Sequence, residues 1–194
     1  MLDKEFWDNR YKSEQTGWDI GYPSTPLKEF IDDLENNDLH ILIPGCGRAY
    51  EAEYLHNKGF KNVSVIDLSP TALSEFSQRL PSFSKKNLIN ANFFNHKGKY
   101  DIILEQTFFC AIDRNLRENY VIHSYELLNE SGKIVGLLFN EEFGNEHPPF
   151  GGSKAEYLNL FSDLFDIEII ETAKNSIEQR KGRELFISFK KKKL

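Results

Sequence analysis

Short hydrophobic runs and longer segments with helical spacing alternate along most of the chain. Runs rich in isoleucine, leucine and valine predict buried strands, which we place at residues 39–43, 63–66, 87–90, 100–105 and 133–139. Apolar residues that recur at every third or fourth position predict helices at residues 3–15, 26–36, 49–57, 69–80 and 114–128. Strands that alternate with helices form a parallel sheet covered on both faces, with a ligand crevice at the carboxyl ends of its strands.

The last third of the chain departs from this alternation. A loop rich in proline and glycine precedes a helix expected at residues 153–161, and two strand-like runs follow at 165–173 and 184–192. Only a polar connection separates these two runs, so they can pair as an antiparallel edge. The pattern therefore predicts a three-layer α/β sandwich with a seven-stranded, mostly parallel sheet and an antiparallel C-terminal edge.

Residues that commonly begin or end helices support several of these boundaries. Thr25 and Ser69 each stand directly before a proline, which predicts that both are N-caps. Gly17 and Gly59 are expected to end the helices that precede them.

Composition favours one globular domain over the whole range 1–194. The chain has 194 residues, of which 40% are hydrophobic, and this is enough for a sizeable core. No apolar run is long enough to span a bilayer, and the first residues lack the order of a secretory signal. We therefore expect a cytoplasmic protein, in which Cys46 and Cys110 are reduced thiols.

Charge narrows the class of partner. A net charge of −6 argues against binding to nucleic acid, which usually needs a clustered basic face. The basic run at residues 190–193 is interpreted as the solvated end of the last strand, with a docking patch for an acidic partner as the alternative. We expect a small-molecule substrate, no nucleic acid, no membrane, no metal, and a monomer or weak dimer.

A glycine turn follows the first predicted strand and carries the first candidate chemistry. Gly45 and Gly47 let the backbone approach a ligand closely, and Asp67 ends the next strand, where a carboxylate can bind ribose hydroxyls. Dinucleotide-binding turns have a third glycine, but here Ala49 and Tyr50 follow. This favours a nucleoside cofactor without phosphates over a nucleotide-dependent oxidoreductase. An ordinary strand-to-helix turn remains the alternative.

Two further predicted strands end in polar side chains. The third leads into Asn92, whose amide can meet an adenine amino group, and Phe93, whose ring can pack on the base. Core packing is the alternative for Phe93. The fourth strand ends with Glu105 and Gln106, where the reacting end of a cofactor would lie.

Five segments, in the same order over nearly the whole chain, resemble the thiopurine S-methyltransferase family, and most closely its halide and thiol methyltransferase branch. They are FWDNRYKSEQTGWDIG, IPGCGRAYEAEYL, VIDLSPTAL, YDIILEQTFFCAIDRNLRENY and HPPFGGS. The resemblance implies a Rossmann-like class I methyltransferase fold. It also implies the cofactor S-adenosyl-L-methionine, which is converted to S-adenosyl-L-homocysteine.

The same resemblance assigns roles to individual residues. It implies that residues 1–36 form a helical lid over a core of residues 37–194. The residues implied in cofactor binding are Trp7, Tyr11, Trp18, Gly45, Gly47, Asp67, Asn92, Phe93 and Gln106, and the acceptor-pocket candidates are Trp18, Gln106, Phe139 and His147. For Trp7 and Tyr11, the apolar stripe of an ordinary surface helix is the alternative.

The sequence departs from the family pattern at three of these positions. Asn92 stands where many relatives carry aspartate, Gln106 replaces an arginine or tyrosine, and Phe139 replaces a tyrosine. We expect the acceptor to be a small soft nucleophile, namely a thiol, thiocyanate, a halide or a thiopurine-like compound. A cofactor-binding module without turnover, or a methyltransferase for another small molecule, is the alternative. Carbon or oxygen acceptors would need a general base, for which His147 and Glu105 are the candidates.

Overall fold

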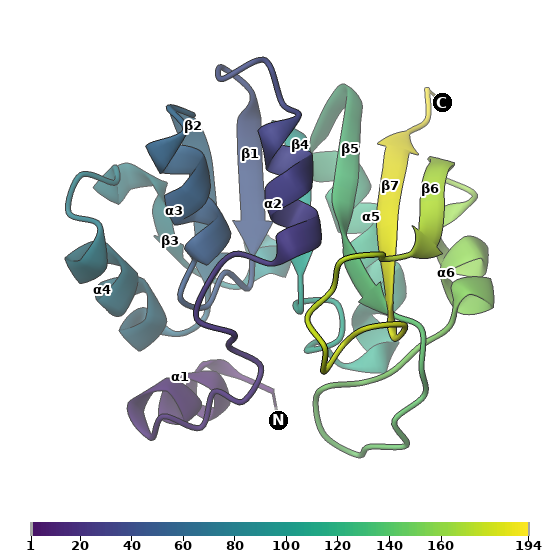
Figure 1. The fold of residues 1–194 in the computed structure, drawn as a ribbon, viewed down its shortest axis with the longest axis horizontal. Coiled ribbons are helices and arrows are strands. Elements are labelled where there is room, and N and C mark those ends of the chain that lie inside the picture. Colours follow the sequence, from purple (N-terminus) through teal and green to yellow (C-terminus); the bar gives the residue numbers. More distant parts are fainter. Residues whose placement is uncertain (1, 194) are drawn as a thin grey trace.

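The computed structural model describes residues 2–193, and its centre is one seven-stranded sheet (Figure 1). The strand order is β3-β2-β1-β4-β5-β7-β6, and only β7 runs antiparallel to its neighbours β5 and β6. This confirms the predicted mostly parallel sheet with an antiparallel edge. The strands are β1 (His40–Pro44), β2 (Asn62–Asp67), β3 (Leu88–Asn90), β4 (Tyr100–Gln106), β5 (Leu128–Phe139), β6 (Phe165–Thr172) and β7 (Glu184–Lys191).

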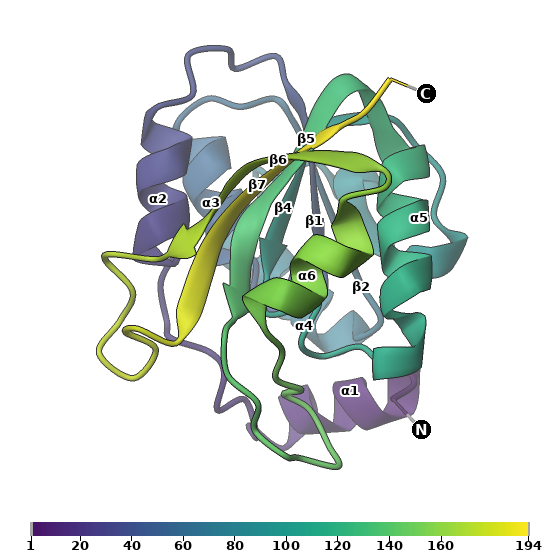
Figure 2. The ribbon, with the colours of Figure 1, turned by 90° about the vertical axis from the view of Figure 1, so that its right-hand side faces the viewer.

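Helices cover both faces of the sheet (Figure 2). They are α1 (Lys4–Lys12), α2 (Thr25–Asp32), α3 (Tyr50–Asn57), α4 (Pro70–Arg79), α5 (Arg117–Leu127) and α6 (Lys154–Phe161). Three short 3-10 helices are η1 (Lys85–Asn87), η2 (Phe93–Asn95) and η3 (Arg114–Leu116). The apolar side chains of α2, α3 and α4 share one core layer, and those of α5 and α6 share the other.

Alternation along each strand produces these two layers. In β1, Ile41 and Ile43 pack in the layer of α2 and α3, whereas Leu42 packs in the layer of α5. Successive side chains of a strand point to opposite faces, so a strand buried on both faces reads as a continuous hydrophobic run. This is why the short apolar runs located the central strands.

The predicted helix starts had different outcomes. Ser69 is the N-cap of α4, because its side-chain oxygen accepts a hydrogen bond from the Ala72 N–H at 3.1 Å. The prediction for Thr25 is wrong: Thr25 is already helical, and Ser24 occupies the N-cap position. Ser24 donates its own backbone N–H to the buried Glu51 carboxylate at 2.9 Å, so a contact with α3 fixes this end.

Several element ends also differ from the prediction. The first helix ends at Lys12 rather than at residue 15, because Ser13 is the C-cap and Glu14 turns into the left-handed region, with a φ of 54°. The second helix ends at Asp32 rather than at residue 36. The strand predicted at 133–139 begins earlier, at Leu128, through an irregular stretch of pairing with β4.

The N-terminal 36 residues do not form one unit. Figure 1 shows α1 beyond the arrowhead of β1, across the carboxyl ends of the parallel strands. In contrast, α2 buries Leu27 and Ile31 in the core layer that it shares with α3. Within the segment 1–36 that was predicted to be a lid, α2 therefore belongs to the core layer, and the part before α2 lies across the carboxyl ends of the strands.

The basic C-terminal run has a structural role that differs from the predicted solvated end. The Lys191 ammonium donates hydrogen bonds to the carbonyls of Tyr125 and Leu128, at the C-terminus of α5. Lys192 donates likewise to the Ser162 carbonyl, directly after α6. Cations at helix C-termini satisfy unpaired carbonyls and complement the helix dipole.

Two further expectations concern membrane-spanning helices and the cysteines. Among residues 2–193, no helix is long and apolar enough to cross a membrane. Cys46 and Cys110 are both free thiols, as expected, and burial raises the pKa of each.

We predict that Gly136→Ala destabilises the fold by about 1–3 kcal/mol, because a Cβ there would lie 2.4 Å from the Glu105 carbonyl oxygen of β4. Gly17→Ala is the matched control, since a Cβ at Gly17 has no neighbour within 4 Å. Urea denaturation of both variants measures the difference. Equal stability of Gly136→Ala and the parent protein would contradict the tight β4–β5 packing.

Candidate cofactor and acceptor site

The turn after β1 needs glycine at two positions. Gly45 and Gly47 have φ values of 56° and 52°, in the left-handed region that side chains disfavour. A Cβ at Gly45 would lie 2.3 Å from a ring carbon of Phe108, and one at Gly47 would lie 2.7 Å from the Tyr11 hydroxyl. The turn is therefore a backbone cradle, closed by one ring from the segment after β4 and one from α1.

The Asp67 carboxylate fastens this turn to the end of β2. Its two oxygens accept the backbone N–H groups of Gly47, at 2.9 Å, and Ser69, at 2.8 Å. The residue is only 8% exposed, and burial raises the pKa of Asp67 although these hydrogen bonds favour the charged form. A carboxylate oxygen has more than one lone pair, so Asp67 can still accept hydrogen bonds from a ligand.

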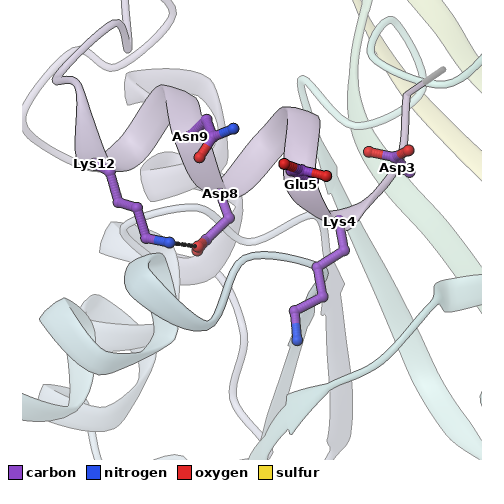
Figure 3. A pocket seen from close by; sticks show the side chains of 6 residues that line it. All are labelled: Asp3, Lys4, Glu5, Asp8, Asn9 and Lys12. Atoms are coloured by element: carbon purple, nitrogen blue, oxygen red, sulfur yellow. Dashed lines mark ion pairs between the residues drawn. The ribbon is translucent and has the colours of Figure 1, made fainter.

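A second carboxylate, Asp8, binds α1 to the start of α4. It accepts hydrogen bonds from the Ser69 hydroxyl at 2.7 Å and from the Thr71 N–H at 3.0 Å, and it pairs with Lys12 at 2.7 Å. Figure 3 shows the Lys12–Asp8 ion pair among six side chains that line a hollow of about 460 Å³ beside α1. Burial opposes ionisation of Asp8, but these hydrogen bonds outweigh it and hold its pKa below the usual range.

The three predicted aromatic residues of the N-terminal segment lie together. The ring of Trp18 meets Trp7 edge to face at 5.7 Å between centroids and meets Tyr11 at 5.8 Å. Tyr11 is buried, and burial together with the nearby Asp67 and Cys46 raises its pKa. Its hydroxyl faces Gly47, so the cluster adjoins the glycine turn and is more than a surface stripe.

The two residues predicted to bind adenine, Asn92 and Phe93, lie in different environments. The third strand ends at Asn90, as the predicted bounds of 87–90 indicated, and Asn92 and Phe93 lie just after it. Asn92 is exposed and caps η2, accepting the Phe94 N–H at 3.0 Å. Phe93 is only 3% exposed and stacks on Tyr120 at 5.5 Å, which is the core packing of the alternative interpretation.

The acceptor-side residues come from β4, β5 and the loop after β5. The side-chain oxygen of Gln106 is buried and has no hydrogen-bond partner among residues 2–193. Phe139 ends β5 and packs on Phe143 at 5.0 Å between ring centroids. His147 is exposed in the loop between β5 and α6.

Glu105 cannot be the general base that the sequence suggested. It is 1% exposed, and its oxygens accept hydrogen bonds from the Phe108 and Phe109 N–H groups and from the Tyr120 hydroxyl, each at 2.8 Å. Its partner Tyr120 belongs to the core layer of α5. The carboxylate is therefore held inside the protein, with both oxygens already in hydrogen bonds.

Sequence reasoning missed Arg180, in the polar connection between β6 and β7. Its guanidinium donates to the Trp18 carbonyl at 2.6 Å and lies 3.5 Å from the Glu184 carboxylate. The contact joins the N-terminal segment to the far edge of the sheet. The two residues are 162 positions apart, and no local pattern marks such a pair. Asp8 was missed for the same reason.

These groups suit S-adenosylmethionine. The backbone cradle and the carboxylate of Asp67 match an amino-acid group and a ribose, and the unpartnered oxygen of Gln106 offers an acceptor. Aromatic faces attract the positive sulfonium. No group of three metal-ligating side chains lies within the described part of the chain.

Comparison with known proteins agrees with this fit. The family model described as Thiopurine S-methyltransferase matches residues 2–193. Thiocyanate methyltransferase 1 of Brassica oleracea is 27% identical over 192 residues, covering 95% of this chain and 84% of that protein. The thiopurine S-methyltransferase of Acinetobacter baylyi is 23% identical, with 93% of this chain and 94% of that protein covered.

A solved structure shows the same fold. It is the Burkholderia thailandensis 1,6-didemethyltoxoflavin-N1-methyltransferase with bound 1,6-didemethyltoxoflavin and S-adenosylhomocysteine. The TM-score is 0.73 at 14% sequence identity, with 98% of this chain and 87% of that chain covered. With the family match and the site geometry together, the chain belongs to the thiopurine S-methyltransferase family and is an S-adenosylmethionine-dependent methyltransferase.

Proposed function

We propose that this methyltransferase transfers the methyl group to a small soft nucleophile: a thiol, thiocyanate, a halide or a thiopurine-like compound. Support comes from the names of the relatives, which include thiol, thiocyanate and thiopurine methyltransferases. The observation that carries the proposal is the cradle of Gly45, Gly47 and Asp67 beneath an aromatic cluster. We also propose that the protein does not act on nucleic acid and is a monomer or weak dimer, in line with its net charge of −6.

In this proposal, residues at the carboxyl ends of β1, β2 and β4 hold the cofactor. Gly45 and Gly47 receive its amino-acid part, Asp67 accepts hydrogen bonds from the ribose, and Gln106 meets the methionyl end. The exposed amide of Asn92 binds the adenine. Phe93 acts only indirectly, through its packing in the core beneath the site. Bound S-adenosylmethionine supplies an electrophilic methyl group on a sulfonium.

The chain's own contribution to the reaction is alignment and exclusion of water. A thiolate or halide ion has no proton to lose, so no general base is required, and the burial of Glu105 is consistent with this. Trp7, Tyr11 and Trp18 shield the sulfonium side, and an enclosed site strips water from a weakly hydrated anion. Trp18, Gln106, Phe139 and His147 remain the proposed acceptor side.

A cofactor-binding module without turnover is the second candidate. It is favoured by the departures at Gln106 and Phe139 and by the exposure of His147, which leave few polar groups to orient an acceptor. Soft anions need little orientation by hydrogen bonds, so the same features suit the first proposal. Only turnover separates the two candidates.

We predict that deletion of residues 1–20 abolishes turnover but leaves a folded sheet. The deleted segment contributes the aromatic cluster, whereas the core layer begins at Leu27 of α2. Asp8→Ala should weaken cofactor binding in the full chain, because it releases α1 from Ser69 and Thr71. Circular dichroism and a methyl-transfer assay measure fold and activity.

Lys28→Met is the matched control for these lid variants. Lys28 also forms an i,i+4 pair, with Asp32, but it lies on α2 away from the cluster. Full activity of the truncated chain would show that the N-terminal segment is not a lid.

We predict S-adenosylhomocysteine formation with at least one member of a panel of thiols, thiocyanate, iodide and thiopurines. His147→Ala should keep thiol methylation within about threefold, because a thiolate acceptor needs no base. Product detection by mass spectrometry measures both outcomes. Inert thiols and iodide, together with methylation of an RNA or protein only, would reject this substrate class.

A further inference from the structure

The buried Glu105 carboxylate is the polar group whose contacts extend furthest through the site. It accepts two consecutive backbone N–H groups, those of Phe108 and Phe109, through the same oxygen. Its other oxygen accepts the Tyr120 hydroxyl of α5. Gly136 on the neighbouring strand leaves room for this side chain, because a Cβ there would lie 2.4 Å from the Cβ of Glu105.

The turn held by Glu105, residues 107–112, touches both halves of the site. On the cofactor side, the Phe108 ring fills the space over Gly45 that a Cβ would occupy. On the acceptor side, the Cys110 carbonyl accepts the Phe150 N–H at 2.7 Å. Phe150 belongs to the loop that carries His147, so one turn fixes the glycine cradle and that loop together.

The backbone of this turn needs such support. Thr107, its first residue, has a φ of 56°, a left-handed conformation that costs a β-branched residue free energy. The hydrogen bonds that the Glu105 carboxylate accepts from the N–H groups of the next two residues, Phe108 and Phe109, compensate for this strain. A side chain at position 105 that accepts these N–H groups less strongly, or not at all, therefore affects the turn rather than a single contact.

We propose that Glu105 is a positioning residue for methyl transfer, whose ionised carboxylate holds the 107–112 turn and thereby sets the cofactor cradle and the acceptor loop together. This rests on the proposed function for its effect on turnover, whereas the coupling itself exists in the protein without substrate. The residue acts through Phe108 and Phe150 and touches no reacting atom.

Burial gives this group a titration in the neutral range. Burial raises the pKa of Glu105 to about 7, against the hydrogen bonds from Phe109, Tyr120 and Phe108. The other titratable or charged groups that surround the turn are Cys110 in the turn itself, Arg117 and Tyr120 on α5, Tyr157 on α6 and Arg180 from the β6–β7 connection. The facing residue on β5 is Gly136, which has no charge.

Protonation weakens the support of the turn. An ionised carboxylate accepts all three hydrogen bonds as a charged acceptor. A proton on Oε2 breaks or reverses the bond from the Tyr120 hydroxyl and leaves Oε1 as a neutral, weaker acceptor for the Phe108 and Phe109 N–H groups. Because the pKa of Glu105 is raised to about 7, only half of the molecules carry the ionised form at that pH, and the fraction falls as the pH is lowered. Turnover should therefore fall as the pH falls through this value.

The first arm of the test follows backbone amides by NMR in the free protein between about pH 5.5 and 8.5. The amides of Gly45, Phe108 and Phe150 should titrate together, and Glu105→Gln should remove the shared transition. Tyr120→Phe should move it to higher pH, because it deletes a hydrogen bond that favours the ionised carboxylate. A transition that persists in Glu105→Gln, or that Tyr120→Phe leaves unshifted, would overturn the proposal.

The second arm measures kcat with thiocyanate, which stays anionic over the same range and so contributes no titration of its own. The kcat of the parent enzyme should fall as the pH falls through the apparent pKa, and Glu105→Gln should flatten this limb. Asp101→Asn is the control, since Asp101 is a β4 carboxylate that bonds His40 and Asn129 at the opposite end of the strand.

The NMR and kinetic experiments distinguish failure of the proposed function from failure of the role proposed for Glu105. Absence of turnover with every acceptor would count against the proposed function, while the NMR arm would still decide the role of Glu105. Turnover with an acid limb that is unchanged in Glu105→Gln would overturn the role of Glu105 and leave the proposed function in place.

Discussion

The Asp67 carboxylate is the interaction on which the rest of the site depends. It holds the backbone of the glycine turn through Gly47 and the start of α4 through Ser69. The Ser69 hydroxyl continues the chain of hydrogen bonds to Asp8, which fixes α1 over the carboxyl ends of the strands. Buried charges are stable only when such partners surround them, so strand, turn and N-terminal helix form one assembly.

The opposite side of the cradle is built by a second buried carboxylate. Glu105 shapes the turn that brings Phe108 onto Gly45, while Tyr11 approaches Gly47 from α1. Asp67 and Glu105 thus lie at the carboxyl ends of β2 and β4, the two strands that flank β1, and both accept hydrogen bonds from backbone N–H groups. Neither is a nucleophile or an exposed base. Such a design suits methyl transfer, in which alignment and water exclusion supply much of the rate.

Much of the fold could be predicted from local sequence patterns. Contacts between residues far apart in the sequence could not. The run at 39–43 located β1 because both faces of that strand are buried, and Ser69 capped α4 as its position before a proline indicated. Thr25 failed as a cap because Ser24 meets Glu51, a contact between distant segments. The burial of Phe93 and the Arg180–Trp18 hydrogen bond depend on packing that no local pattern records.

Calorimetric titration with S-adenosylhomocysteine tests the central role of Asp67 most directly. The account predicts that Asp67→Ala weakens binding by about 1–3 kcal/mol, because ribose hydroxyls and two backbone N–H groups lose their acceptor. Asp101→Ala, which removes a carboxylate at the opposite, amino-terminal end of β4, should bind like the parent protein. Equal affinity of Asp67→Ala and the parent protein, with both shown to be folded, would contradict the account.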